Sequence, residues 1–387
     1  MRDVQFTANN HLTLLHCGAA YFPALLAAID EARTEIYFET YIFSPDETGA
    51  LVLNALIRAA NRGVEVHVIT DWVGTGRKMT KQLDTTFRAG GVHHRTFNPW
   101  FRRGIARLHR KLCVIDRQVA FVGGLNIIDD LRYDYNVKLA LPAPRWDFAV
   151  RVEGPLVGMI HHEAEAEWGR TGKMPLYARF EMYREMRTKR RFSIAKTALA
   201  GFIVRDNLRN RMTIQRAYLR AIGGARKSVL LATPYFAPGR KFRRALAMAA
   251  SRGVDVTLLI GSGEFWIQDA VANSFYPKLL KSGVKVYEFS KTELHGKVAV
   301  VDEDWATVGS SNCDGLSLFV NHEANVVVRD PALARELRAH IQDGIAQAVA
   351  IQPEDFDNIS WYRRLWHGAA YLLYKALMRT FTPGDYS

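Results

Sequence analysis

One short motif, H-x-K-x-x-x-x-D, occurs twice in the chain and combines residue types that suit phosphoryl transfer. Its two copies consist, in order, of His109, Lys111 and Asp116, and of His295, Lys297 and Asp302. On a strand, alternate residues share a face, so the His and the Lys of each copy are predicted to point the same way. An imidazole can attack phosphorus or transfer a proton, and an ammonium group offsets charge that develops on phosphoryl oxygens. Each copy can therefore supply a base and a cation to one spot.

The duplication extends beyond the motif and indicates an internal repeat. A Gly-rich turn and an asparagine follow each copy at the same interval, ending at Asn126 and at Asn312. Three further pairs of similar segments keep one order in both halves: 32–49 with 225–242, 61–69 with 251–260, and 89–97 with 281–289. The middle pair is typical of a helix end, a glycine cap and a strand. We therefore expect two equivalent lobes.

A carboxylate also follows each motif at a corresponding place, Asp147 in the first half and Glu323 in the second. A carboxylate beside an imidazole fixes its tautomer and supports positive charge on the ring. We interpret these two residues as the orienting partners of the histidines. The alternative is that each lies on an edge strand and faces solvent.

Together with the tails GGLN (123–126) and GSSN (309–312), the paired motifs make the chain resemble the phospholipase D superfamily from about residue 6 to residue 349. The segments 40–49, 109–127, 148–155 and 204–211 are similar to bacterial cardiolipin synthases of the short type, which lack an N-terminal membrane hairpin. The resemblance implies an α/β fold with two pseudo-symmetric lobes, each a mixed β-sheet flanked by helices. The active site would lie at the lobe interface, where a pseudo-twofold axis brings His109 and His295 together.

The resemblance also implies a two-step reaction through a phosphohistidine. One imidazole attacks the phosphorus while the other protonates the departing alcohol and later deprotonates the incoming one. In the family the nucleophile is usually the first histidine, here His109, which leaves His295 as acid and base; the symmetry of the sequence leaves this order open. The phosphorus would be surrounded by four donors, Lys111, Lys297, Asn126 and Asn312.

The sequence has no C-x-x-C and no H-E-x-x-H pattern, and we expect neither a metal nor another cofactor. Asp116 and Asp302 belong to the catalytic motif. Ordinary turn preferences nevertheless favour a role in holding the backbone after the strand over contact with substrate.

Length and composition fit two domains with buried cores, since the chain has 387 residues and 48% hydrophobic content. We predict an N-terminal lobe over residues 1–168, a basic linker over 169–212, a C-terminal lobe over 213–350 and an amphipathic C-terminal segment over 351–387. The apolar stretch 193–204 within the linker is too short and too charged to span a bilayer. It is interpreted either as a segment resting on a membrane surface or as part of a solvated basic linker.

The net charge of +13 requires an anionic partner, and both nucleic acid and acidic lipid qualify. A helical wheel of residues 361–378 gathers aromatic and aliphatic side chains on one half and basic ones on the other. Such a helix fits the surface of a negatively charged bilayer, although a helix packed on the protein's own core gives the same wheel. Residues 100–107 are interpreted either as a rim that meets phosphate head groups or as a plain surface loop.

The N-terminal residues lack the apolar core of a signal peptide. Cys17, Cys113 and Cys313 show no paired spacing, which fits a reducing compartment. We expect a peripheral protein on the cytoplasmic face of a bacterial inner membrane. A monomer suffices, because one chain supplies both half-sites.

The leading hypothesis is a phosphatidyl transferase of lipid biosynthesis that moves a phosphatidyl group to the glycerol head of phosphatidylglycerol or to another alcohol. The alternative is a phospholipase D-type phosphodiesterase, either a lipid hydrolase or, with less support, a nuclease. The motif does not separate transfer from hydrolysis, because only the second nucleophile differs. An inactive lipid-binding scaffold would require a broken motif, and both copies are intact. Expected partners are anionic phospholipids and a membrane surface, whereas nucleic acid is disfavoured because a nuclease needs no amphipathic tail.

Overall fold

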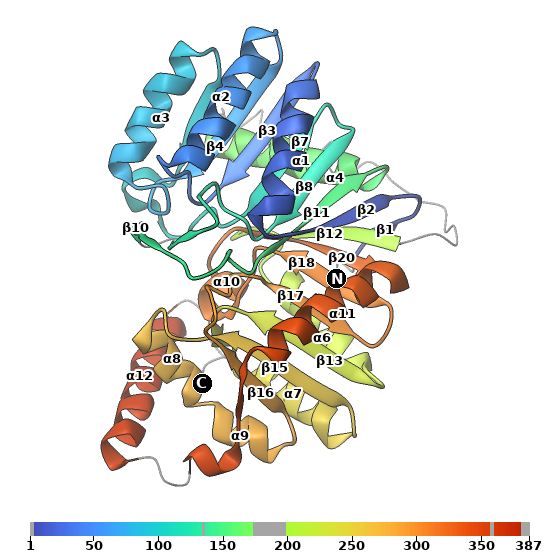
Figure 1. The fold of residues 1–387 in the computed structure, drawn as a ribbon, viewed down its shortest axis with the longest axis vertical. Helices are drawn as coiled ribbons and strands as arrows, with labels where there is room; N and C mark the ends of the chain where they lie inside the picture. The colour runs from blue at the N-terminus through green and yellow to red at the C-terminus, as the bar shows by residue number, and fades with distance from the viewer. Residues whose placement is uncertain (1–3, 134–135, 173–198, 357–359, 381–387) are drawn as a thin grey trace.

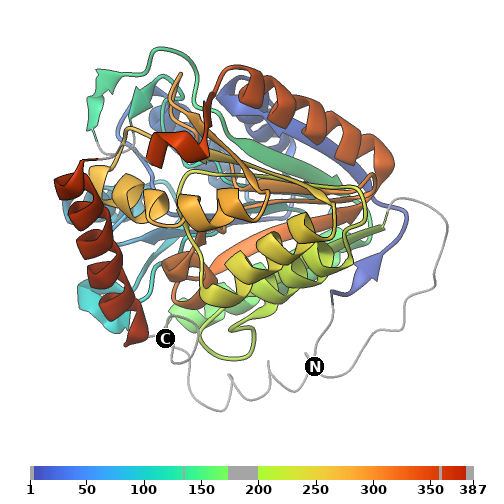
Figure 2. The same ribbon diagram turned by 90° about the horizontal axis from the view of Figure 1, so that it is seen from below.

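The computed structural model describes residues 4–133, 136–172, 199–356 and 360–380. The chain forms two α/β halves that are stacked through their sheets, with most helices on the outer faces and α4 (Leu156–Thr171) and α11 (Pro331–Ala346) packed on the shared core (Figure 1). The same arrangement is visible from below, where the helices of the second half flank the central layers of strands (Figure 2). The predicted fold class, two mixed sheets flanked by helices, is confirmed.

The N-terminal half contains a seven-stranded mixed sheet. Its strands, in spatial order, are β2 (His11–His16), β11 (Phe148–Glu153), β8 (Val119–Gly123), β7 (Lys111–Ile115), β3 (Glu35–Thr40), β4 (Glu65–Asp71) and β5 (His93–Phe97). The pairs β3–β4 and β4–β5 are parallel, and the other neighbours are antiparallel. Its helices are α1 (Cys17–Glu31), α2 (Glu47–Asn61), α3 (Arg77–Ala89) and α4 (Leu156–Thr171).

The C-terminal half contains a nine-stranded sheet. Its strands, in spatial order, are β1 (Phe6–Thr7), β12 (Leu199–Arg205), β20 (Glu323–Arg329), β18 (Trp305–Gly309), β17 (Val298–Val301), β13 (Ser228–Thr233), β15 (Asp255–Gly261), β16 (Lys285–Phe289) and β21 (Val349–Ile351). Its helices are α6 (Thr213–Gly224), α7 (Arg240–Ser251), α8 (Trp266–Asn273), α9 (Tyr276–Lys281), α10 (Gly315–Phe319), α11 (Pro331–Ala346) and α12 (Trp361–Arg379).

The two sheets repeat one topology over six strands. The run β11-β8-β7-β3-β4-β5 in the first half corresponds to β20-β18-β17-β13-β15-β16 in the second. In each half a helix ends just before a glycine with positive φ, Gly63 after α2 and Gly253 after α7, and a strand follows at once. The helix end, glycine and strand predicted for both halves are therefore confirmed.

Smaller elements surround the ends of the two sheets. They are the hairpin of β9 (Arg132–Tyr133) and β10 (Asn136–Ala140), the paired β14 (Phe236–Ala237) and β19 (Cys313–Asp314), the strand β6 (Arg102–Ile105), and the 3-10 turns η1 (Pro99–Phe101) and η2 (Pro353–Phe356).

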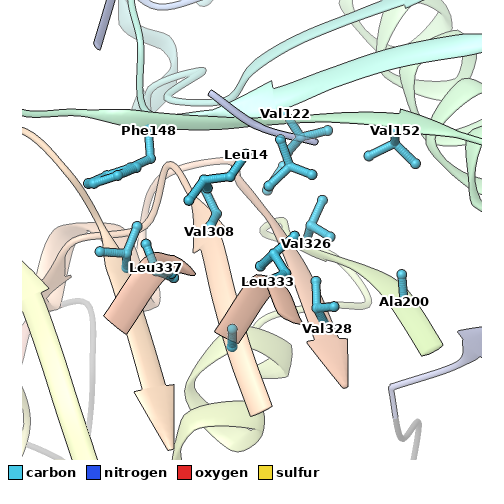
Figure 3. Packing of buried hydrophobic residues seen from close by; sticks show 14 of the residues in the cluster. Leu14, Val122, Phe148, Val152, Ala200, Val308, Val326, Val328, Leu333 and Leu337 are labelled. Atoms are coloured by element: carbon cyan, nitrogen blue, oxygen red, sulfur yellow. The ribbon is translucent and has the colours of Figure 1, made fainter. Parts of the chain in front are cut away.

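A shared apolar core holds the two sheets face to face. Valine, leucine and phenylalanine side chains from β8 and β11 meet those of β18, β20 and α11 across the interface (Figure 3). Residues on β7 alternate between this core, which receives Leu112 and Val114, and a second core beneath the outer helices, which receives Cys113 and Ile115. Both faces of the strand are buried, and the four residues that follow Lys111 on it are all apolar.

The structure corrects the predicted linker at its C-terminal end. Residues 199–205 form β12, which pairs with β1 on one side and with β20 on the other. Six of these seven residues are buried. The described part of the apolar stretch 193–204 is therefore a sheet strand and does not rest on a membrane, because its side chains fill cores on both faces of the sheet. Residues 173–198 lie outside the described part of the chain.

The predicted boundaries of the two lobes, 1–168 and 213–350, also differ from the structure. The second sheet includes β1 from the N-terminus, and its strand β21 extends from Val349 to Ile351. The C-terminal segment forms the predicted helix as α12. Among the helices that the structure describes, none is both long enough and apolar enough to cross a membrane.

Candidate active site

Two short backbone bridges join the halves at one end of the stacked sheets. Leu108 pairs with His322, and the amide of His109 donates to the His322 carbonyl at 2.9 Å. Trp146 pairs with Leu294, and the amide of His295 donates to the Trp146 carbonyl at 3.0 Å. Each motif histidine is thus attached by its own backbone to the opposite half. The two attachments are equivalent under the internal repeat.

Each histidine is also paired with the carboxylate of the opposite half. The Nδ1 atom of His109 lies 3.0 Å from Oε1 and 3.1 Å from Oε2 of Glu323. The Nδ1 atom of His295 lies 2.5 Å from Oδ2 of Asp147. Both carboxylates are fully buried, at 0% exposure; Asp147 directly precedes β11 and Glu323 begins β20, and both strands are interior to their sheets. The alternative of edge-strand carboxylates facing solvent is therefore wrong.

The hydrogen bonds define which nitrogen of His109 carries the proton. Its Nδ1 lies 3.1 Å from the backbone carbonyl oxygen of Ser310, which can only accept. Nδ1 must therefore be the donor to both Ser310 and Glu323. In the neutral ring, Nε2 then keeps its lone pair and can act as a nucleophile or base.

The two motif lysines are buried beside the histidines. Lys111 Nζ donates to the carbonyl of His109 at 2.7 Å, and Lys297 Nζ donates to the carbonyl of His295. Lys111 also lies over the ring of Tyr41, with Nζ 5.1 Å from its centroid, and the same ring packs against His109. The strands β7 and β17 begin at Lys111 and at Val298, so both histidines precede them. The predicted shared strand face of His and Lys stays a prediction.

Buried charges of both halves act on His109. Burial lowers the pKa of His109, Lys111 and Lys297 lower it further, and Glu323 opposes them. Burial alone would raise the pKa of Asp147, but the charges of His295 and Lys297 outweigh this effect and lower it. The charges of His109 and Lys111 likewise lower the pKa of Glu323 against its burial. Both carboxylates are therefore ionised, and Lys297 of the second half lies close enough to act on His109 of the first.

The motif asparagines follow β8 and β18 and are buried. Asn126 Oδ1 accepts from the amide of Ile42 at 3.2 Å. Asn312 Nδ2 lies 3.5 Å from Asp314 Oδ2, and its buried Oδ1 has no protein hydrogen-bond partner. These contacts hold both side chains just beyond the ends of β8 and β18. Their predicted role as donors to a phosphoryl group stays a prediction.

The motif aspartates lie elsewhere. Asp116 follows the last residue of β7, at the end opposite to His109, and its carboxylate accepts from the amides of Arg33, Thr34 and Glu35. Asp302 follows β17 in the same way. It accepts from the amides of residues 226, 227 and 228. The inclusion of both aspartates among the catalytic residues is corrected: they close turns, as turn preferences favoured, and do not reach the histidines.

Sequence reasoning did not identify Ser310 as part of the site. Its hydroxyl donates to Glu323 Oε2, and its carbonyl receives the His109 hydrogen bond. The equivalent residue in the first half is Gly124, where a Cβ would lie 2.2 Å from Asp147 Oδ1. The difference between GGLN and GSSN was the available signal. Its meaning depends on a contact between halves that the repeat alone does not reveal.

No group of three or more His, Cys, Asp or Glu side chains in the described part of the chain has the arrangement to hold a metal ion. The charged groups that the structure gathers at the site are thus two imidazoles, two ammonium groups and two carboxylates. Such a set can support attack on a phosphodiester, proton transfer to a leaving alcohol and stabilisation of phosphoryl oxygens.

Comparison with known proteins agrees with this arrangement. The family model described as cardiolipin synthase, PLD-like domain, matches residues 25–143 and 218–344. Cardiolipin synthase B of Escherichia coli strain K12 is 35% identical over 365 residues, covering 92% of this chain and 84% of that protein. Cardiolipin synthase B of Salmonella typhimurium strain LT2 is 37% identical over 341 residues, covering 86% and 80%.

Among solved structures, phosphatidylserine synthase from Haemophilus influenzae Rd KW20 is similar in fold. The two structures match with a TM-score of 0.70 at 15% sequence identity, covering 97% of this chain and 96% of that one. At this level of identity the match establishes the common fold alone.

Replacement of either motif aspartate should reduce stability without removing the histidine pairs. We expect Asp116→Ala and Asp302→Ala each to lower the free energy of unfolding by about 1 to 3 kcal/mol, because each leaves several backbone amides without their hydrogen-bond acceptor. Burial opposes ionisation of Asp116, but its hydrogen bonds to Thr34 and neighbouring amides lower its pKa. The stabilisation is therefore present above the unfolded pKa and is lost as pH falls through the folded one.

Urea denaturation at neutral and acidic pH measures this effect. Asp30→Ala is the matched control, because the ion pairs of Asp30 with Arg58 and Arg62 are exposed and their loss should cost less than about 1 kcal/mol. Equal losses in Asp116→Ala and Asp30→Ala would contradict the assignment.

Proposed function

The chain belongs to the family of cardiolipin synthases built from phospholipase D-like domains, and we propose that it transfers a phosphatidyl group between phospholipids through a phosphohistidine. The donor is a phospholipid, and the acceptor is the glycerol head of phosphatidylglycerol. The observation that carries the proposal is the crossed pairing of His109 with Glu323 and of His295 with Asp147. It assembles one site from both halves of the chain.

In the first step, His109 acts as the nucleophile. Its Nε2 forms a bond to phosphorus as the bond from phosphorus to the leaving alcohol breaks, and the alcohol oxygen takes a proton from His295. Two features of His109 support this role: Nδ1 already donates to Ser310 and Glu323, and the lowered pKa keeps the ring neutral. His295 suits the acid role, because ionised Asp147 lies 2.5 Å from its Nδ1 and stabilises the imidazolium.

In the second step, His295 takes the proton of the incoming hydroxyl group. The hydroxyl oxygen bonds to phosphorus, the bond between phosphorus and His109 breaks, and both histidines return to their starting states. Lys111 and Lys297 supply positive charge near the phosphoryl oxygens, and Asn126 and Asn312 supply amide donors. These buried side chains are oriented before substrate arrives, which reduces reorganisation during the reaction.

The lipid substrates place the protein at a membrane. We infer peripheral attachment at the cytoplasmic face of a bacterial inner membrane, where phosphatidylglycerol and other anionic phospholipids are the partners. The net charge of +13 supports attraction to such a surface. Hydrolysis by the same phosphohistidine remains the alternative reaction, since water could replace the lipid alcohol in the second step.

Product analysis tests transfer against hydrolysis. Purified protein is incubated with phosphatidylglycerol vesicles, and the lipids are identified by mass spectrometry. Formation of cardiolipin and free glycerol is expected, whereas phosphatidic acid without cardiolipin would mean that the chain is a hydrolase. Turnover should fall by about 1,000-fold or more in His109→Ala and in His295→Ala, because each removes a group that acts on the reacting atoms.

Trapping the intermediate tests the order of the histidines. With a substrate that carries a good leaving group, which needs no general acid, His295→Ala should still accumulate a covalent phosphatidyl adduct on His109. Peptide mass spectrometry locates the adduct. An adduct on His295 in the unaltered protein would reverse the two roles.

The rate of adduct formation should depend on the charge of Glu323. Because the pKa of His109 is lowered from 6.5, its neutral form persists to lower pH, and the acid limb of the rate should lie below pH 6.5. Glu323→Gln removes a charge that raises this pKa, so the acid limb should move further down while the rate falls by about 100-fold to 10,000-fold. Quenched-flow measurements of adduct formation across pH give the rate and the position of the acid limb. A shift of the acid limb to higher pH in Glu323→Gln would contradict the pairing of His109 with Glu323.

A further inference from the structure

The outer face of α12 exposes a continuous set of large apolar side chains. Trp361, Leu372 and Leu373 are 74%, 63% and 68% exposed, and Tyr362, Leu365 and Leu377 are also exposed. A contiguous apolar surface of this kind on a folded protein marks an interaction site more often than a solvated face. The helix therefore presents a surface that needs a partner.

The inner edge of the same helix is fixed to the protein. Trp366 stacks on Trp266 of α8, with ring centroids 4.8 Å apart, and Tyr371 packs against Phe275. Ala370 is buried in the core of the second half. Trp266 itself is 66% exposed, so α8 extends the apolar surface. The two helices lie together at one edge of the molecule in both views (Figures 1 and 2).

One part of the amphipathic helix thus packs on the protein's own core, and another part is available for a membrane surface. A narrow stripe of apolar residues packs on the protein, and the larger remainder faces outward.

Contacts of α12 join this surface to both halves of the active site. Tyr374 Oη accepts from the amide of Gly315 at 2.7 Å and donates to the carbonyl of Ala237 at 3.3 Å. Ala237 ends β14, and Gly315 directly follows β19, the strand that pairs with β14. Strand β19 begins directly after Asn312. The surface is therefore anchored beside one of the predicted phosphate donors.

Met378 makes the second attachment. It is fully buried in a small apolar cluster with Ala106 and Val320. Ala106 lies just before His109 on the chain, and Val320 lies just before Glu323. The C-terminal end of α12 thus rests on the two segments that carry the first histidine and its carboxylate.

Charge distinguishes between the possible partners of this face. Residues 361–379 include Arg363, Arg364, Lys375 and Arg379 and no acidic residue. The whole chain carries a net charge of +13, so two copies that met through this basic segment would repel one another. An anionic lipid surface complements both the charge and the exposed Trp, Tyr and Leu side chains.

We propose that the outer face of α12, extended by Trp266 and Ile267 of α8, docks on a bilayer that contains anionic phospholipid. The contacts of Tyr374 and Met378 hold this docking surface at a fixed position relative to Asn312 and His109. The inference rests on the proposed function in one respect, that the substrate is a lipid of the same bilayer. The docking surface delivers the site to the head groups.

Vesicle co-sedimentation tests the docking surface directly. The double variant Leu372→Ser/Leu373→Ser should bind vesicles of phosphatidylcholine mixed with phosphatidylglycerol about tenfold more weakly or worse, because it removes two exposed apolar side chains from the face. The matched control is Leu51→Ser/Met248→Ser, which removes two half-exposed apolar side chains from α2 and α7. Its vesicle binding should equal that of the unaltered chain.

Two outcomes would overturn the proposal. One is unchanged vesicle binding by the Leu372→Ser/Leu373→Ser variant. The other is a dimer of the unaltered chain in size-exclusion chromatography that this variant converts to a monomer, because the face would then bind a second copy. Matching thermal unfolding curves of the two double variants would show that neither result comes from misfolding.

Turnover of dispersed substrate separates docking from chemistry. With a short-chain phosphatidylglycerol below its micelle concentration, the Leu372→Ser/Leu373→Ser variant should match the unaltered chain, while its turnover on vesicles falls with binding. An equal loss on both substrates would contradict a docking role. Vesicle binding by the unaltered chain without formation of cardiolipin would refute the proposed function and leave the docking surface intact.

Discussion

Each motif histidine is held by a carboxylate that belongs to the other half of the chain. A fully buried carboxylate is costly unless hydrogen bonds compensate for its burial, and His295 and His109 supply the bonds that Asp147 and Glu323 receive from the opposite half. The crossed pairs therefore link the chemistry to the association of the two sheets. Separation of the halves would expose the apolar core and leave both carboxylates without their partners.

The shared core and the backbone bridges explain how this geometry is maintained. Apolar side chains of β8, β11, β18 and β20 fix the distance between the sheets (Figure 3). The bridges at Leu108 and Trp146 then fix the position of each histidine against the opposite half. The histidine side chains have few rotamers available, and their backbone is held by both halves. This gives the preorganisation that phosphoryl transfer requires.

The sequence was sufficient for the repeat and for the residues of the crossed pairs, because equivalent residues recur in both halves, and the two-lobed fold was implied by the resemblance to the phospholipase D superfamily. It did not assign Asp147 to His295 or Glu323 to His109, since comparison of two halves aligns equivalent positions and says nothing of contacts across the axis. Ser310 was missed for the same reason. The strand β12 was taken as linker, because a short apolar run next to a basic segment does not by itself distinguish a buried strand from a surface segment.

The two halves hold their histidines by different physical means despite equal motifs. Beside His109, Arg110 forms a buried bidentate ion pair with Glu39, at 2.6 and 2.7 Å. Its counterpart beside His295 is Gly296, where a Cβ would lie 2.7 Å from the ring of Trp146.

A buried ion pair tolerates little change in geometry, because a displaced charge loses its compensation. Close packing of an aromatic ring on glycine instead excludes polar atoms. The residue after the first histidine therefore belongs to a buried ion pair, and the residue after the second packs on an aromatic ring. Two imidazoles in such different surroundings need not share one chemical role, and this difference in structure supports assigning nucleophile and acid to different halves of a repeated sequence.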